Sequence, residues 1–342
     1  PRLVVVNGVV DLERSVLPAV AGVTVSALSA APADAARLHT ERSDAEIADA
    51  YLALELAYGT DGAFVDVAAG SIVDVPIHVV HVAVPGTMAN TSCSGVLIRL
   101  GAGSTATVVE SRIGVGDAVG GSNVRTSIVL ADDATLEHVL IQDLPSTQVH
   151  LARTEIDQAA GSTLHTRSFN LGAAYGRVAY RVELNGAGAL AELSGLYFGV
   201  GEQILDQQLN VVHAQPDCTS RQLFRGVLDD ASTGVFNGGI DVRPGADGTD
   251  AEQANDNLLL SNRAEANSQP RLEILADEVA CKHGATVGQL DDTALYYLRS
   301  RGIAADEARR LLINGFADQI VDEVADETLR AWIIHRLGHD DV

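Results

Sequence analysis

The chain is poor in cysteine. Its 342 residues contain only three, Cys93, Cys218 and Cys281, and they lie far apart in the sequence. An odd number at such spacing excludes a disulfide framework and is typical of a reducing compartment. No two of them form a CxxC pair, so the chain contains neither a zinc ribbon nor a self-contained four-cysteine iron–sulfur site.

Long apolar runs and a leader segment are also missing. No stretch of 18 consecutive apolar residues occurs, which predicts no membrane span. No basic and apolar leader opens the sequence, so we expect a cytoplasmic protein. Aromatic residues make up 4% of the chain, and its core must therefore be packed mainly by valine, leucine, isoleucine and alanine.

Positive charge is scarce. The formal net charge is −23, and Lys282 is the only lysine beside 22 arginines. A surface with this balance repels phosphates, which argues against a nucleic-acid partner. Genome composition or adaptation to salt is the simplest explanation of the acidic surface, and no cationic ligand has to be invoked.

The first 59 residues predict a hairpin followed by helix. Residues 2–10 read RLVVVNGVV, in which Asn-Gly between two apolar runs is a strong hairpin signal. Residues 34–56 carry helical signals, with Ser43 and Glu46 as a capping box and Gly59 as the stop. Residues 72–84 then read as one longer strand that contains Pro76, which suggests a bend or an edge position.

A repeat dominates residues 60–290. A turn of small residues followed by an alternating strand recurs near positions 70, 103, 133, 161 and 188, at intervals of about 27 to 33 residues. Stacked β rungs have such a period, because each rung buries its apolar face only against its neighbours. We therefore predict a parallel β-helix, or solenoid, in preference to a β-sandwich, whose strands come at 8–12-residue spacing without a longer repeat.

Residues 291–342 predict a small helical domain. Asp291 or Asp292 can cap a first helix, and residues 304–324 and 326–337 show amphipathic patterns. The apolar positions either pack these helices together or offer a docking face to a partner. The residues chosen for that second role are Leu312, Phe316, Trp332 and Ile333.

The stretch between the two regions holds a candidate metal pair. If residues 280–283 form a strand, Cys281 and His283 point to the same face with Cα atoms about 6.6 Å apart. A thiolate and an imidazole suit iron or an iron–sulfur cluster. The alternative is a buried thiol beside a surface histidine. Lys282 points to the other face and is a bystander, although its charge could lower the pKa of the thiol.

The remaining cysteines and the apolar-run histidines are better explained by structure. Cys218 opens a strand and Cys93 lies near a turn, whereas His81 and His213 are expected to be core histidines with satisfied hydrogen bonds.

Seven motifs in the second half of the chain resemble a known family. They follow in order as RQLFRGV (221–227), VFNG (235–238), NLLLS (257–261), PRLEILAD (270–277), CKHGATVGQL (281–290), ALYYLRSRGI (294–303) and EARRLLINGF (307–316). The series is similar to that of the SufB/SufD family of iron–sulfur cluster assembly proteins, and the CxHGATVG form is most similar to its SufD branch. The SufB branch typically reads HEATTS there and carries further cysteines.

The resemblance implies a right-handed β-helix with a helical C-terminal domain. It implies a complex with a SufB-like subunit and a SufC-like ATPase that docks on the helices. It also implies that His283 is a ligand of a nascent iron–sulfur cluster, held transiently and shared with the partner chain, with Cys281 as a second candidate. It leaves open a reduced flavin in the complex. Family members usually carry a longer helical N-terminal region than this chain.

The sequence also argues against activity of its own. The glycine-rich turns at 101–103 and 186–188 are not followed by helices, so no nucleotide site is predicted and ATP hydrolysis belongs to a partner. Two rivals remain: a polysaccharide-active β-helix enzyme, for which one tryptophan and six phenylalanines are few, and a purely structural subunit of the same assembly. In isolation we expect a homodimer through the β-helix.

Overall fold

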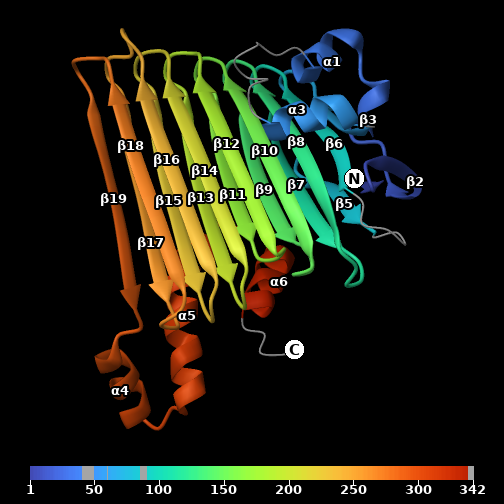
Figure 1. Cartoon of the computed structure of the whole chain (residues 1–342). Coiled ribbons are helices and arrows are strands. Elements are labelled where there is room, and N and C mark those ends of the chain that lie inside the picture. The colour runs from blue at the N-terminus through green and yellow to red at the C-terminus, as the bar shows by residue number, and fades with distance from the viewer. Residues whose placement is uncertain (41–49, 60, 85–90, 338–342) are drawn as a thin grey trace.

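A computed structural model describes residues 1–40, 50–59, 61–84 and 91–337 of the chain. The described strands form two facing sheets that run the length of the molecule (Figure 1). One sheet, in spatial order from the C-terminal end, consists of β19 (Ala280–Gln289), β17 (Asp250–Leu259), β15 (Thr219–Leu228), β13 (Leu190–Gly199), β11 (Thr163–Asn170), β9 (Thr135–Asp143), β7 (Thr105–Gly114), β5 (Ile77–Ala83), β1 (Arg2–Val6) and β2 (Val9–Val16).

The other sheet takes the strands that alternate with these along the chain. In the same order it consists of β18 (Glu265–Ile274), β16 (Thr233–Val242), β14 (Ile204–His213), β12 (Tyr175–Leu184), β10 (Gln148–Gln158), β8 (Gly120–Leu130), β6 (Thr91–Leu100), β4 (Gly62–Val67) and β3 (Val23–Ala27). From β4 onward successive strands thus switch between the sheets, and each sheet is parallel except for the pairs β1–β2 and β3–β4. The chain is a parallel β-solenoid, as the sequence predicts.

The register explains the sequence repeat. Thr163 on β11 lies opposite Leu190 on β13, and Thr233 on β16 lies opposite Glu265 on β18. One turn of the solenoid therefore matches the spacing of the small-residue turns. Because side chains alternate between the two faces of a strand, every second residue points into the interior, where a continuous apolar core runs from Leu3 to Ala264.

The N-terminal segment caps the first rungs. Asn7 and Gly8 adopt φ values of 49° and 84° at the turn between β1 and β2, as an Asn-Gly hairpin requires. A short 3₁₀ turn, η1 (Leu28–Ala30), leads to the helices α1 (Ala33–Thr40) and α3 (Ala50–Tyr58). Both helices pack on the outer face of the sheet that contains β6 and β8.

The structure does not describe one predicted N-terminal feature, and it shortens another. The capping box of Ser43 and Glu46 lies outside the described residues. The long strand expected over residues 72–84 is wrong in its first part, because β5 begins at Ile77, directly after Pro76, and Ile72 forms only an isolated bridge. Proline lacks the N–H that a ladder needs, so it precedes the strand.

The C-terminal helices lie beyond the lower ends of the strands and against one sheet (Figure 1). They are α4 (Asp292–Ser300), α5 (Ala305–Val321) and α6 (Glu327–Leu337). Asp291 caps α4, with its side chain accepting a hydrogen bond from the backbone N–H of Thr293 at 2.8 Å. Apolar residues of α5 and α6 form a second core with the outer face of β7 to β15. None of the described helices is long and apolar enough to cross a membrane.

Candidate functional site: the open end of the solenoid

No described residues cover the C-terminal end of the solenoid interior. Strands β18 and β19 are the last members of their sheets, so each pairs with a neighbour on one side only. Inward-facing residues are buried on β16 and nearly all buried on β17, but most are half-buried on β18, and they are half-buried to exposed on β19. The interior of the solenoid therefore opens to solvent at this end.

Cys281 and His283 lie on the inward face of this last rung. They pair with Ala251 and Gln253 of β17, both of which are buried inside the solenoid. Cys281 is half-buried and packs against a small cluster that includes Ile240 and Ala251, whereas His283 is exposed. The prediction that both residues face the same way from one strand is confirmed.

The thiol and the lysine differ in their surroundings. Burial and the nearby Asp250 carboxylate raise the pKa of Cys281 above its ordinary value. Lys282 points to the opposite face, where its Nζ lies 3.0 Å from Oε1 of Glu252. The pKa of the thiol is therefore raised instead of lowered, and Lys282 stands apart from the pair, as the sequence suggests.

This pair alone cannot form a complete metal site. Among the described residues, no group of three or more histidine, cysteine, aspartate or glutamate side chains is arranged to hold a metal ion. An iron–sulfur cluster is commonly held by four protein ligands, and a mononuclear iron site by at least three. Two donors at an open end therefore fit a cluster only if the other ligands come from outside the described residues.

The remaining cysteines have structural surroundings. Cys218 is fully buried and its Sγ lies 3.3 Å from the carbonyl oxygen of Gly186, while Cys93 is 6% exposed on β6. Burial raises the pKa of both thiols. Neither cysteine lies on the last rung, so neither belongs to the open end.

His81 and His213 are buried as predicted, but only one ring nitrogen of each forms a hydrogen bond within the described residues. Nδ1 of His81 lies 3.3 Å from Ser94 Oγ, and Nε2 of His213 lies 2.9 Å from Ser220 Oγ. Within the described residues the second ring nitrogen of each histidine has no hydrogen-bond partner. Burial lowers the pKa of each ring to about 4, which keeps both neutral.

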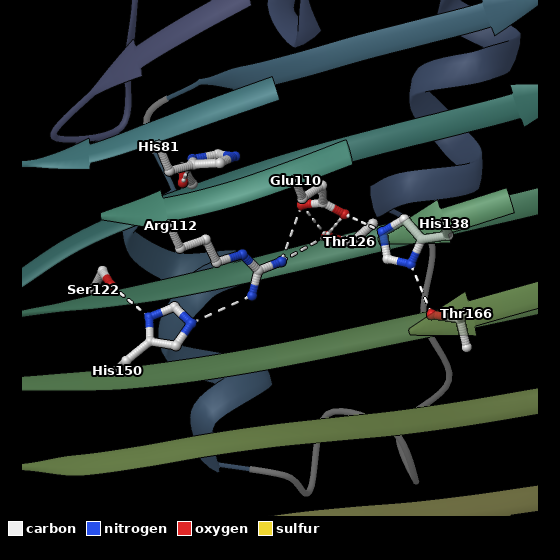
Figure 2. A network of polar contacts seen from close by, with 9 residues as sticks. His81, Glu110, Arg112, Ser122, Thr126, His138, His150 and Thr166 are labelled. Atoms are coloured by element: carbon white, nitrogen blue, oxygen red, sulfur yellow. Dashed lines mark hydrogen bonds and ion pairs between the residues drawn. The ribbon is translucent and has the colours of Figure 1, made fainter. Parts of the chain in front are cut away.

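A network of charged and polar side chains, which was not predicted from the sequence, lies inside the first rungs (Figure 2). Glu110 and Arg112 of β7 are 0% and 1% exposed, and Arg112 Nη2 donates to Glu110 Oε2 at 3.0 Å. His138 Nε2 lies 2.9 Å from Glu110 Oε1, and Thr126 Oγ1 donates to the same carboxylate. Although burial opposes ionisation, Arg112 and His138 hold the pKa of Glu110 far below its ordinary value.

This network extends across the interior to the opposite sheet. Arg112 Nη1 donates to His150 Nε2 at 3.4 Å, and His150 shares a hydrogen bond of 2.7 Å with Ser122. Burial and the charge of Arg112 lower the pKa of His150 well below its ordinary value. The alternation of β7 could have indicated this, because Glu110 and Arg112 share the parity of the buried Ala106 and Val108.

The four residues predicted for partner docking divide by burial. Ile333 is 0% exposed and packs into the core between the helices and the sheet, so it is not accessible in this structure. Phe316 is half-buried against the same core and lies under the guanidinium of Arg225, whose carbon is 4.7 Å from the ring centre. Leu312 is half-buried, and Trp332 is 37% exposed.

The structure defines a parallel β-solenoid whose last described rung carries a Cys–His pair and is followed by a helical tail. The family described as SUF system FeS cluster assembly, SufBD core domain, matches residues 83–316. The chain belongs to this family.

Individual relatives agree with the family match. The chain is 34% identical over 265 residues to the iron–sulfur cluster assembly protein SufD of Escherichia coli, covering 77% of this chain and 63% of that protein. It is 29% identical over 286 residues to SufD of Bacillus subtilis, covering 82% and 64% of the two chains. An iron–sulfur cluster assembly SufBD family protein of Mycobacterium leprae is 39% identical over 216 residues, covering 60% and 55%. The chain thus spans less than two thirds of the length of these relatives.

Proposed function

We propose that this chain is a SufD-type scaffold subunit and not an enzyme by itself. A nascent iron–sulfur cluster is its cargo, and His283 is the ligand that it contributes, with Cys281 as a second donor. The observation that carries the proposal is the last rung, where two inward-facing donors lie on a strand that no further strand of the described residues covers. Membership of an iron–sulfur assembly family supports the cargo and leaves the polysaccharide-active alternative without support.

A second chain must complete the site. Since the described residues supply only this pair at the open end, a SufB-like subunit provides the other ligands in our proposal. Metal binding requires the thiolate form of cysteine and the neutral form of imidazole. Burial and the Asp250 carboxylate raise the pKa of Cys281, which disfavours the thiolate that metal binding requires. His283 is therefore the better first ligand.

The edges of the last rung suit pairing with that chain. An unpaired strand edge is a template for another strand, and β18 and β19 each have one such edge. Val287, which faces inward on β19, is 54% exposed and adds apolar surface. In the assembly this end meets the SufB-like subunit, and in isolation it pairs with a second copy to form a homodimer.

The helical tail is the proposed docking surface for a SufC-like ATPase. Tyr296 and Tyr297 of α4 are 75% and 56% exposed, and Leu311 and Trp332 are 44% and 37% exposed. Aromatic residues of this kind are typical of interface centres. Trp332 and the half-buried Leu312 and Phe316 remain our docking residues, and Ile333 supports them from beneath. Nucleotide and any reduced flavin bind elsewhere in the complex, which we place in the cytoplasm.

The experiment is anaerobic reconstitution of the three-protein complex with Fe(II) and sulfide. The variant is His283→Ala, and the matched control is Lys282→Ala, which removes the neighbouring side chain on the opposite face of the same strand. We expect His283→Ala to lower bound iron at least about tenfold, because loss of a ligand should cost no less than loss of its supporting residue. Lys282→Ala should match wild type. Equal iron content in wild type and His283→Ala would refute the ligand role and favour a purely structural subunit.

A further inference from the structure

The inward-facing positions beneath His283 form a ladder of side-chain amides. His283 on β19 pairs with Gln253 on β17, and Gln253 pairs with Gln222 on β15. Neighbouring strands lie about 4.8 Å apart, so the three positions stack along the solenoid axis. Gln253 and Gln222 are only 1% and 2% exposed, whereas His283 above them is exposed.

The amide of Gln253 is only partly satisfied. Its Nε2 donates to Oε1 of Gln222 at 2.6 Å, but within the described residues its own Oε1 is buried and accepts no hydrogen bond. A buried carbonyl oxygen without a donor is unusual. The nitrogen of this amide is thus engaged with the preceding rung, and the oxygen of the same amide is left for a donor other than Gln222.

The facing sheet leaves room for this amide. A Cβ atom on Gly238 of β16 would lie 2.5 Å from Nε2 and 2.7 Å from Oε1 of Gln253, so the glutamine reaches across the interior to a glycine. One rung later, Pro270 pairs with Gly238 while His283 pairs with Gln253. An imidazole of His283 that is folded inward therefore stands directly over the carboxamide of Gln253.

We propose that Gln253 is a positioning residue for His283, an inference that rests on the proposed role of His283 as an iron ligand. When a partner covers the open end, His283 folds inward and one ring N–H donates to Oε1 of Gln253. The second ring nitrogen then presents its lone pair toward the interface, because a neutral imidazole has one donor and one acceptor nitrogen. Metal-ligating histidines are commonly oriented by an oxygen acceptor in this manner.

The test measures binding of Fe(II) alone to the anaerobic three-protein complex by equilibrium dialysis. Gln253→Leu removes the acceptor and should weaken Fe(II) binding about tenfold. Gln253→Glu keeps an acceptor oxygen, and the amide of Gln222 can turn to donate to it, so this variant should retain wild-type affinity. Gln158→Leu is the control, because it removes another buried side-chain amide several rungs away from His283, and it should lower the melting temperature without changing Fe(II) affinity.

Combination with His283→Ala separates positioning from support of the fold. If Gln253 acts through His283, Gln253→Leu has no further effect on Fe(II) affinity in the His283→Ala background. Equal losses in both backgrounds, or failure of Gln253→Glu to restore affinity, would overturn the positioning role.

The two proposals fail in different ways. Wild-type Fe(II) affinity in His283→Ala refutes the ligand role itself. Reduced affinity in His283→Ala together with wild-type affinity in Gln253→Leu refutes the positioning role alone.

Discussion

The two ends of the solenoid interior differ in charge and in access. Near the N-terminal end, Glu110 and Arg112 form an ion pair that neighbouring rungs cover on both sides (Figure 2). Near the C-terminal end the buried polar residues are neutral amides, such as Gln253 and Asn255, and the rung above them is open. A buried charge is tolerated only when it is fully paired. The interior ion pair therefore lies in rungs that are covered on both sides. Neutral groups at the open end leave that surface free to meet another chain without a large desolvation cost.

The largest effect is expected from breaking the sealed ion pair. Arg112→Leu leaves the carboxylate of Glu110 buried with His138 as its remaining close ionisable partner. We expect the free energy of unfolding to fall by about 3–5 kcal/mol, measured by urea unfolding at pH 7.5. Arg271→Leu is the control at the open end, where the arginine is 51% exposed and pairs with Asp241 and Glu273, and it should cost less than about 1 kcal/mol. Similar losses in both variants would remove the distinction between the two ends.

Acid should weaken the chain through its buried neutral histidines. His81 and His213 have pKa values lowered to about 4 by burial, whereas an unfolded histidine titrates near 6.5. Between these values the unfolded chain binds the extra protons, so stability is full above about pH 6.5 and falls as the pH drops toward 4.

The size of this acid effect can be checked with variants. From pH 7.5 to pH 5 each histidine should cost about 2 kcal/mol of unfolding free energy. Urea unfolding at the two pH values, on wild type and on His81→Gln and His213→Gln, should show a smaller pH dependence in each variant. An unchanged dependence would mean that other groups govern acid unfolding. The low pKa of Glu110 keeps its own contribution intact down to more acidic pH.

The smallest effect on stability is expected at the open end itself. Val287→Asp places a charge at a position that is 54% exposed, and it should change the free energy of unfolding by less than about 0.5 kcal/mol. Self-association should nevertheless weaken about tenfold, or about 1.4 kcal/mol, by sedimentation equilibrium. Val149→Asp, at a 40% exposed position on β10, is the control and should leave self-association unchanged. Unaltered association of the Val287→Asp chain would place the homodimer surface elsewhere.

The solenoid could be predicted from sequence because its signal is repeated. Similar turns of small residues, each followed by an alternating strand, recur at five positions, so an irregular turn does not obscure the period. The pairing of Cys281 with His283 on one face follows from strand geometry alone. The strand over residues 72–84 was predicted too long because a proline that precedes a strand and a proline within an edge strand look alike in sequence.

The charged network was harder to see because β7 also has a buried residue on its outward face, which blurs the alternation. Val109 points outward yet is 6% exposed, since it packs in the cluster that the C-terminal helices form on the outer face. With both faces buried, inward and outward positions no longer differ in polarity. Ile333 illustrates a related limit of sequence-based prediction. An apolar stripe on a helix indicates that its residues are buried, but it does not tell whether the same chain or a partner covers them.

The attachment of the C-terminal helices has a mechanical consequence. Arg336 of α6 binds Asp143 at the end of β9, Glu323 beyond α5 accepts a hydrogen bond from Ser194 of β13, and Arg309 binds Asp229 after β15. The end of the chain thus returns along the stack and is tied to rungs well before the last one. A force applied to the helices is therefore transmitted to several rungs at the same time. Under the proposed docking of an ATPase on these helices, a force on them would displace the attached rungs together.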